Sequence, residues 1–558
     1  MSRGVLKSLD DLQLGSRVCL YGTGRGCNIF RALLRHLRTD VEIVCLIDSF
    51  KTGEKDGLKI ISPYDISENS ADFDIILITS GFWRDIEKIL STLQITNYMI
   101  VDASLLSDVP VTIYDNDGAL RHPVYRGLFT ELWNMGDDEG IVKGLLAEME
   151  TKGVVLDRYH ALIQLLQSHP APHHVNTLLC SEEIREGIDE VKSFPTDVYL
   201  DISSVCNIRC RFCKCKAGMF PVEMVTLKQV QEIDWFKYIK VFAFYGGTAE
   251  SLTNPEFLDI FNYVHDRYPH LHSILYTNGV GLNRKILTAL AGKITNLHVS
   301  MNASNKKDYD TVIKNGNWKL FSDNMTAMAE IMKDRDKPFI SASFVMMRWN
   351  LDSALECLEF ARAAGASLVG LNHYVSGHTL KYHKDNSVVL NEKFSKENSL
   401  YYDKERSDRV FEKVRKRAEA LGIQLVSPLP FNREDYFIDY SVRTLSRPSE
   451  ICGNPWTHMY LRWGNISRKK EVWFCCAMAM DMGAFYDTNE ILKAEGLMKV
   501  RNSSILRAYR KTVNGTNINP ICTYCRHQDR FDPDSVYPPD QREFFEFNNM
   551  PVPQHLMP

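Results

Sequence analysis

Short runs of apolar residues alternate with helical patterns through the middle of the chain. The runs that predict strands lie at residues 198–202, 241–245, 272–276, 297–301, 339–346 and 368–372. Helical stretches such as 227–235 and 353–364 separate them, and Gly365 stands at the C-cap position of the second helix. Strands that alternate with helices in this way predict parallel β/α units.

A second α/β pattern lies at the N-terminus. Apolar runs at residues 17–21, 42–47, 75–79 and 98–101 predict buried strands in a doubly wound arrangement. Gly22, Gly24 and Gly26 form a turn that can bring a phosphate to a helix N-terminus, and Asp48 falls where an acid would bind ribose. Cys27, however, replaces the third glycine of the dinucleotide fingerprint. The segment resembles the Rossmann-like domains of bacterial polysaccharide- and sugar-modifying enzymes. Two interpretations stay open for it, a nucleotide or nucleotide-sugar site and a docking module.

The remaining stretches predict connecting elements. Residues 139–152 and 156–168 are amphipathic helices, and the pair His173-His174 after them is expected in a solvated loop. The polar stretch 379–405 indicates an irregular insertion, followed by a helix at 409–421 and a strand at 423–426. We therefore divide the chain into an N-terminal domain (1–110), a helical linker (111–194), a central domain (195–378), an insertion with connecting elements (379–440) and a C-terminal region (441–558).

Composition narrows the class of protein. The chain has 558 residues, of which 44% are hydrophobic and 24% are charged, as in soluble globular proteins of several domains. A net charge of −4 argues against binding of nucleic acid through a basic surface. No apolar run reaches the length of a membrane span, and no signal-peptide core is present. We therefore expect a protein of the reducing cytoplasm, in which Cys19, Cys27, Cys45, Cys180 and Cys357 are core residues.

Three cysteines carry the strongest chemical signal. Cys206, Cys210 and Cys213 follow the first central strand with the spacing C-x3-C-x2-C, and Phe212 precedes the last of them. Three thiolates suit a 4Fe–4S cluster whose fourth iron is left open. The motif resembles that of radical S-adenosylmethionine (radical SAM) enzymes, in which SAM occupies the open iron. Cys215 is then a bystander, because a fourth thiolate would exclude SAM.

The ends of the next strands extend this resemblance. The sequence G-G-T-A-E-S-L-T-N-P-E-F follows the second strand like the family's G-G-E-P loop, which implies contacts from Gly247, Thr248 and Glu250 to the methionyl group. In this register Thr248 and Ala249 stand where the family has its two glycines. The turn Thr277-Asn278-Gly279 implies a contact from Asn278, and Ser300 and Asn302 fall at the ribose hydroxyls. The resemblance covers about residues 196–378. It implies a partial (β/α)6 TIM-type barrel with its chemistry at the carboxyl ends of the strands.

A second cysteine group lies downstream. Cys452, Cys475 or Cys476, Cys522 and Cys525 supply four thiolates, enough for one fully ligated cluster. The group resembles the SPASM/twitch extension of radical SAM enzymes, a small cysteine-rich domain that holds auxiliary 4Fe–4S clusters. Hairpin strands are expected on either side of Gly464. Zinc is the alternative metal for four such cysteines.

Together these resemblances imply an α/β enzyme. It would receive an electron from a flavodoxin- or ferredoxin-type donor, cleave SAM to a 5′-deoxyadenosyl radical and abstract hydrogen from its substrate. The sugar-related N-terminal domain favours a carbohydrate, nucleotide sugar or other small metabolite as substrate. Peptide modification is the alternative within the enzyme class. A zinc-stabilised scaffold without catalytic activity is the alternative outside it.

Overall fold

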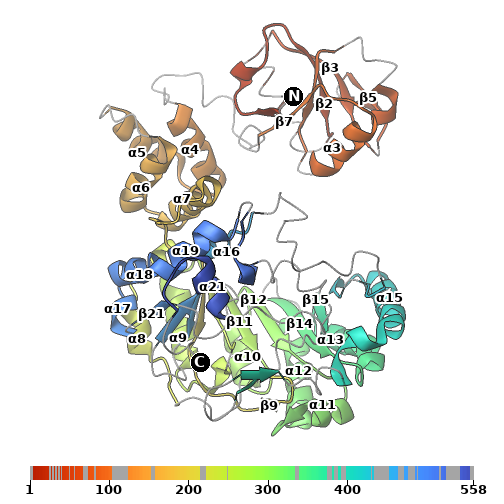
Figure 1. Cartoon of the computed structure of the whole chain (residues 1–558), viewed down its shortest axis with the longest axis vertical. Coiled ribbons are helices and arrows are strands. Elements are labelled where there is room, and N and C mark those ends of the chain that lie inside the picture. Colours follow the sequence, from red (N-terminus) through yellow and green to blue (C-terminus); the bar gives the residue numbers. More distant parts are fainter. Residues whose placement is uncertain are drawn as a thin grey trace. The chain divides into compact units, whose positions relative to one another are not determined.

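The structure is a computed structural model with two compact units, Met1–Val175 and Asn176–Pro558, which we describe separately (Figure 1). Its described residues are all those outside the following positions: 1–3, 24–26, 28–29, 32–33, 35–37, 39, 50, 56, 67–72, 81–82, 103–122, 152–156, 214–221, 248, 334–337, 374–379, 383–387, 391–396, 429, 433–450, 463–469, 475–483, 487, 515–516, 523–540 and 553–558.

The first unit contains a seven-stranded sheet in the order β1-β7-β6-β2-β3-β5-β4. All neighbours are parallel except β4 and β5, which are antiparallel. The chain leaves β2 for β3 and β5 on one side and returns to β6 on the other, which is the reversal of a doubly wound sheet. The strands are β1 (Gly4–Leu6), β2 (Arg17–Tyr21), β3 (Glu42–Ile47), β4 (Gly53–Lys55), β5 (Leu58–Ile61), β6 (Ile75–Ile78) and β7 (Tyr98–Val101).

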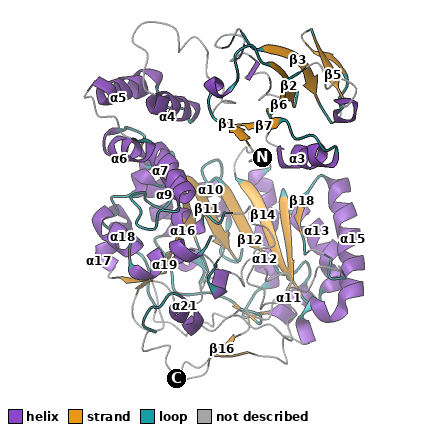
Figure 2. Cartoon of the chain, turned by 45° about the horizontal axis from the view of Figure 1, so that its top comes forward, coloured by secondary structure: helices purple, strands orange, loops and turns teal. Residues whose placement is uncertain are grey.

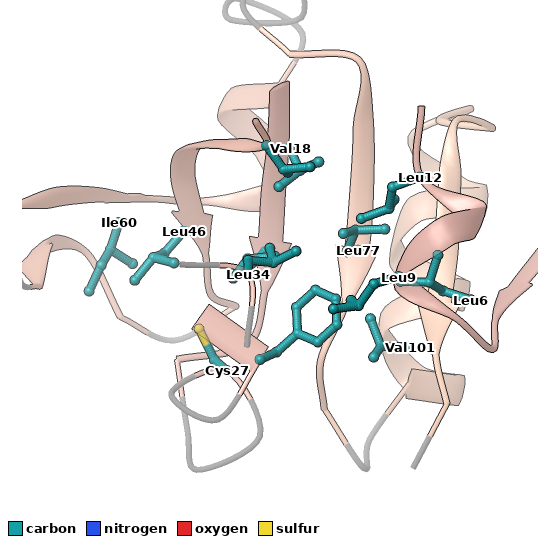
Figure 3. Close-up of a cluster of buried hydrophobic side chains, with 13 residues drawn as sticks. Leu6, Leu9, Leu12, Val18, Cys27, Leu34, Leu46, Ile60, Leu77 and Val101 are labelled. Carbon is teal, nitrogen blue, oxygen red and sulfur yellow. The ribbon is translucent and has the colours of Figure 1, made fainter. Parts of the chain in front are cut away.

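Both faces of this sheet are buried, because successive side chains of a strand point to opposite faces. In β2, Val18 and Leu20 pack in one hydrophobic cluster and Cys19 and Tyr21 pack in the other. Figure 3 shows the first cluster, in which Cys27 and Leu34 lie among side chains from the strands. The second cluster includes Ile86 and Leu90 of α3 (Trp83–Thr92). Burial on both faces explains why these strands are continuous apolar runs.

Cys19 and Cys45 are core residues as predicted, but they are joined in a disulfide, which we did not expect. The register of β2 and β3 pairs the two residues directly, and their Cα atoms lie 5.0 Å apart. That separation is within the range that a disulfide spans. The prediction of unbridged thiols therefore failed because it depended on strand register.

Helices complete the first unit. They are α4 (Pro123–Asn134), α5 (Glu139–Thr151), α6 (Arg158–Ser168) and the first residues of α7 (Pro172–Glu186). The expected solvated loop at His173-His174 is wrong, because Pro172 starts α7 and both histidines are helical. His174 is partly buried, and its Nδ1 lies 2.9 Å from Oδ1 of Asp137.

The second unit is built on a ten-stranded sheet in the order β18-β15-β14-β12-β11-β10-β8-β19-β20-β21. Neighbours from β18 to β19 are parallel, and β20 and β21 add to them antiparallel. The strands are β8 (Asp197–Asp201), β10 (Val241–Phe244), β11 (His272–Thr277), β12 (Asn296–Ser300), β14 (Phe339–Met346), β15 (Leu368–His373), β18 (Gln424–Val426), β19 (His458–Arg462), β20 (Lys470–Trp473) and β21 (Ala484–Tyr486). The predicted parallel strands at 198–202 to 368–372 are thus confirmed to within one or two residues.

Helices connect the parallel strands, as β/α units require (Figure 2). Gly422 (φ +65°) is left-handed directly after α15 (Lys404–Leu421). Gly365 (φ +91°) is also left-handed, but it lies one residue beyond the predicted C-cap position, because Ala364 caps α13 (Ala354–Ala363). The helices are α8 (Leu227–Gln231), α9 (Phe257–Arg267), α10 (Arg284–Leu290), α11 (Lys306–Val312), α12 (Trp318–Met332), α13 (Ala354–Ala363), α15 (Lys404–Leu421), α16 (Asn454–Thr457), α17 (Thr488–Ile491), α18 (Ala494–Arg501), α19 (Ser504–Thr512) and α21 (Gln541–Phe547).

Two short strand pairs lie outside the large sheet. β9 (Arg209–Cys210) pairs antiparallel with β13 (Ile313–Lys314). β16 (Leu380–Tyr382) and β17 (Val388–Leu390) form an antiparallel pair within the stretch 379–405, which we expected to be irregular. Among the described residues, no helix is both long and apolar enough to cross a bilayer.

Candidate functional site

The three predicted cluster cysteines lie together on the loop after β8. Cys206, Cys210 and Cys213 are all half-buried. The backbone N–H of Cys213 donates to the carbonyl oxygen of Cys210 at 3.1 Å, so the chain turns tightly between them. The three thiols are close enough to influence one another electrostatically. Residues that sequence spacing grouped are therefore also grouped in space.

Neighbouring segments hold this loop at several points. In the β9–β13 pair, Cys210 lies opposite Ile313. The carbonyl oxygen of Val205 accepts the backbone N–H of Glu250 at 2.9 Å and the hydroxyl of Thr253 at 3.0 Å. The cysteine loop is thus tied to the loop after β10 and to the segment after α11.

Burial favours the neutral thiol at Cys206 and Cys210. Burial raises the pKa of Cys206, and the nearby Glu250 and Cys213 raise it further. Burial also raises the pKa of Cys210, with Cys213 and Cys206 adding to the effect. Metal binding must therefore displace protons from these thiols, as is general for cysteine ligands.

The donor set fits an iron–sulfur cluster. Three thiols on one loop are the soft ligands that iron–sulfur clusters use. Within the part of the chain that the structure describes, no three His, Cys, Asp or Glu side chains lie close enough to hold one metal ion. In a 4Fe–4S cluster each cysteine binds a different iron, so its ligands are farther apart than those of a single ion.

Glycines are required in the loop after β10. A Cβ at Gly246 would lie 2.8 Å from the carbonyl oxygen of Ala249, and a Cβ at Gly247 would overlap the ring of Tyr245. The backbone N–H of Gly247 donates to Oδ1 of Asp201, at the end of β8, at 3.2 Å. Gly247 therefore lies at the strand ends, whereas the predicted contact residue Thr248 lies outside the described residues.

Glu250 is a buried connector between two loops. Its side chain is almost completely inaccessible, and it accepts the hydroxyl of Thr277 and the backbone N–H of Asn278, both at 2.7 Å. It also accepts the backbone N–H of Leu252 at 3.3 Å. Burial raises the pKa of Glu250 to about 6, although these hydrogen bonds oppose the shift. Both of its carboxylate oxygens are thus occupied within the protein.

Asn278 connects the turn after β11 to the cysteine loop. Its side-chain Nδ2 donates to Oδ1 of Asn207 at 2.7 Å and lies 3.8 Å from Sγ of Cys206. Its Oδ1 accepts the backbone N–H of Val280 at 3.0 Å. Because Glu250 binds its backbone, Asn278 joins three segments beside one predicted cluster ligand.

Ser300 and Asn302 lie at the end of β12. Asn302 is buried and left-handed, with φ +57°. Its Oδ1 accepts the backbone N–H of Val345 at 3.2 Å, and its Nδ2 makes a long contact of 3.5 Å to the carbonyl oxygen of Ser300. One side of the Asn302 amide is therefore engaged by β14, which leaves Nδ2 as its available donor.

Aromatic side chains that sequence reasoning missed line one face of the sheet. Tyr199 stacks on Tyr460 with ring centroids 4.4 Å apart, and Tyr245 contacts the rings of both. The row continues through Tyr276, 5.4 Å from Tyr245, to His298, 5.1 Å from Tyr276. All five are half-buried, whereas their strand neighbours such as Leu200 and Leu275 are fully buried. The available signal was the period-two alternation, in which Tyr199, His298 and Tyr460 each stand between two apolar residues.

His298 is a neutral imidazole at the end of this row. Its Nδ1 lies 2.9 Å from Oγ of Ser341, and its Nε2 lies 3.0 Å from Oγ of Ser343. Burial lowers the pKa of His298. A neutral ring can accept a hydrogen bond at one nitrogen and donate at the other, so two serine hydroxyls match it.

The second cysteine group is described in part. Cys452 is half-buried and Cys522 is buried, whereas Cys475, Cys476 and Cys525 lie outside the described residues. β19 and β20 are antiparallel on either side of the stretch that contains Gly464. The hairpin strands are therefore as predicted, and the turn between them is not described.

The N-terminal turn is also described in part, because Gly24, Arg25 and Gly26 lie outside the described residues. Gly22 has φ +110°, which an L side chain rarely adopts. Asp48 accepts the hydroxyl of Thr23 at 2.5 Å and the backbone N–H of Lys51 at 3.1 Å. The acid predicted to bind ribose therefore holds the turn in this structure.

Comparison with known proteins identifies two segments. Residues 14–101 match the family C2185-like, N-terminal, and residues 200–366 match the radical SAM superfamily. A GTP 3′,8-cyclase from Paenarthrobacter nicotinovorans is 26% identical over 129 residues, which are 22% of this chain and 36% of that protein. The chain thus aligns with about a third of the length of this relative.

Solved structures are similar at low identity. Streptococcus suis SuiB bound to S-adenosylmethionine has a TM-score of 0.45 and 11% identity, over 71% of this chain and 84% of SuiB. Native anSMEcpe with bound AdoMet has a TM-score of 0.38 and 14% identity, over 63% of this chain and 96% of anSMEcpe. The cysteine motif, the parallel sheet and the family match agree, and the chain carries a radical SAM domain at residues 200–366.

Proposed function

We propose that the protein is a radical SAM enzyme that acts on a carbohydrate or another small metabolite. The observation that carries the proposal is the grouping of Cys206, Cys210 and Cys213 beside the turn at Asn278, within the matched domain. A 4Fe–4S cluster at these cysteines, with SAM on its open iron, would supply a 5′-deoxyadenosyl radical for hydrogen abstraction. The sheet would then be the partial (β/α)6 barrel of the superfamily, with its chemistry at the strand ends.

The protein's own residues would position the reactants. Glu250 and Asn278 tie the loops after β10 and β11 to the cysteine loop, so the proposed SAM contacts from Gly247, Thr248, Glu250, Asn278, Ser300 and Asn302 would come from strand ends of a single sheet. Gly246 and Gly247 are required for the conformation of the loop after β10, since at each position a Cβ would collide with a neighbouring group of the protein.

A neutral, hydroxyl-bearing substrate is supported by the aromatic row. The rings of Tyr199, Tyr245 and Tyr276 offer flat apolar surfaces, and His298 with its serines offers hydrogen-bonding groups beside them. Sites for small molecules combine such apolar lining with a few placed polar groups. A sugar ring, which has C–H faces and hydroxyl groups, suits this combination.

Further components complete the proposal. One auxiliary 4Fe–4S cluster at Cys452, Cys475 or Cys476, Cys522 and Cys525 would accept an electron from the substrate radical. A flavodoxin- or ferredoxin-type protein in the cytoplasm would be the electron donor. The N-terminal domain would be a Rossmann-like module that binds a nucleotide sugar or docks a partner.

Anaerobic reconstitution tests the proposal. The full chain should hold about eight irons if both clusters have four, and should release 5′-deoxyadenosine from SAM under reduction. Replacement of Cys206, Cys210 and Cys213 by alanine should remove about half of the iron and all of this cleavage. Cleavage that persists in the triple variant would contradict the proposal, and zinc without iron would favour the scaffold alternative.

The substrate class can be tested with deuterated candidates. Deuterium from a fully deuterated sugar or nucleotide sugar should appear in 5′-deoxyadenosine. Transfer from a deuterated peptide alone would instead establish peptide modification, the alternative within the enzyme class.

A further inference from the structure

Two asparagines in the segment that follows α19, Asn514 and Asn519, bind the two described cysteines of the C-terminal group. Asn514 binds the backbone of Cys452 in both directions, accepting its N–H at 2.9 Å and donating to its carbonyl oxygen at 3.2 Å. A side-chain amide can do this because it presents an acceptor and a donor side by side. Asn514 thus fixes Cys452 through its backbone groups.

Asn519 makes a different set of contacts. Its Oδ1 accepts the backbone N–H of Cys522 at 2.9 Å, which orients the amide so that Nδ2 faces Sγ of Cys522 at 3.2 Å. The same Nδ2 also lies 3.2 Å from the carbonyl oxygen and 3.1 Å from the hydroxyl of Thr512. Asn519 is completely buried, and Cys522 is 8% exposed. An amide N–H is therefore held against the Cys522 sulfur inside the protein.

These contacts bring two cysteines that are far apart in the sequence to one helix end. Thr512 is the last residue of α19, and Asn514 follows two residues later. The chain after Cys452 is fixed as well, because the buried Arg510 of α19 donates to the carbonyl oxygen of Pro455 at 3.0 Å. Cys452 and Cys522 are thus both held beside the C-terminal end of α19.

We infer that Asn519 is a positioning residue that tunes the auxiliary cluster through an N–H···S hydrogen bond to Cys522. This inference rests on the auxiliary cluster of the proposed function. The two described cysteines, Cys452 and Cys522, fit such a cluster, since both are thiols that are held beside the C-terminal end of α19. Hydrogen bonds to cluster sulfurs set the reduction potential, because they stabilise the more negative, reduced state. Asn519 therefore raises the potential of the cluster and favours electron acceptance.

The test uses the full chain with Cys206, Cys210 and Cys213 replaced by alanine, so that the auxiliary cluster is the only one expected. Asn519→Leu removes the amide N–H without adding a charge or a hydroxyl donor, and Asn519→Ala is a second, smaller replacement. The matched control is Asn514→Ala, which removes hydrogen bonds to the backbone of Cys452 at the same helix end. Each protein is reconstituted with iron and sulfide, and the midpoint potential is measured by a redox titration followed by electron paramagnetic resonance.

We expect both Asn519 variants to shift the midpoint potential to more negative values than Asn514→Ala does. Equal potentials in all four proteins would overturn the inference while leaving the auxiliary cluster in place. Loss of iron from Asn514→Ala as well as from both Asn519 variants would assign the asparagines a purely structural role and would also overturn it. A parent protein without iron would reject the auxiliary cluster itself, and the inference with it.

Discussion

The buried carboxylate of Glu250 accepts the hydroxyl of Thr277 at 2.7 Å, which joins the loop after β10 to the end of β11. The same carboxylate binds the backbone of Asn278, whose side chain reaches the cysteine loop. A charged group is stable in such a buried position only when hydrogen-bond donors surround it. The geometry around the predicted cluster thus depends on one acid that solvent hardly reaches.

The first prediction concerns this acid. Glu250→Gln keeps the shape but turns an NH2 group towards donors that need an acceptor. We expect a loss of about 1–3 kcal/mol in the free energy of unfolding, together with weaker SAM binding by reconstituted protein. Denaturant unfolding and calorimetry measure the two effects. Glu256→Gln is the control, because Glu256 accepts the backbone N–H of Leu227 at the start of α8 instead. Equal SAM affinity in both variants would show that Glu250 does not organise the site.

The second prediction concerns pH and His298. Because burial lowers the pKa of His298 below that of the unfolded chain, the folded state binds fewer protons and loses stability as the pH falls below about 6.5. One such group contributes a slope of at most about 1.4 kcal/mol per pH unit. His298→Gln cannot titrate, so its free energy of unfolding should depend less steeply on pH between about 7.5 and 5.5. Identical slopes for the two proteins would show that His298 does not titrate differently on unfolding.

The third prediction separates the two clusters. Cys522→Ala should remove the iron of the auxiliary site while SAM cleavage continues without coupling to substrate. Turnover of substrate should therefore fall much further than release of 5′-deoxyadenosine, when both are quantified in the same reaction. Cys180→Ala is the control, since Cys180 is a buried thiol outside both groups and burial raises its pKa to about 12. Normal turnover by Cys522→Ala would mean that the auxiliary cluster has no part in the reaction.

The fourth prediction concerns the N-terminal turn. If Gly22-Thr23-Gly24-Arg25-Gly26 binds the phosphates of a nucleotide sugar, calorimetry of the full chain should detect binding, and Gly24→Val and Arg25→Ala should abolish it. Arg17→Ala is the control, because Arg17 starts β2 and pairs with Glu42 on the surface, whereas the turn follows the other end of the strand. No binding across a broad panel of nucleotide sugars would favour the docking module.

Local sequence was sufficient for the apolar strands that it predicted, but not for the start of α7 or for the β16–β17 pair. The strands Arg17–Tyr21, Tyr98–Val101 and Phe339–Met346 have the predicted bounds, because strands of a sheet that is covered on both faces are mainly apolar runs, which stand out in the sequence. The grouping of Cys206, Cys210 and Cys213 could also be predicted from the sequence, since one short loop carries all three.

Pairings between residues that are distant in the sequence could not be predicted from local sequence patterns. The register that places Cys19 opposite Cys45, and the position of β19 beside β8, depend on which strands become neighbours. The aromatic row arises for the same reason, because Tyr199 and Tyr460 meet only across that strand pair.

The sequence by itself therefore determined the β/α order and the close spacing of Cys206, Cys210 and Cys213, which are local properties of the chain. Only the tertiary structure decided that Glu250 is an internal connector and that α19 anchors Cys452 and Cys522. Such roles depend on packing that brings distant backbone groups within hydrogen-bonding distance, and no spacing along the chain encodes that distance.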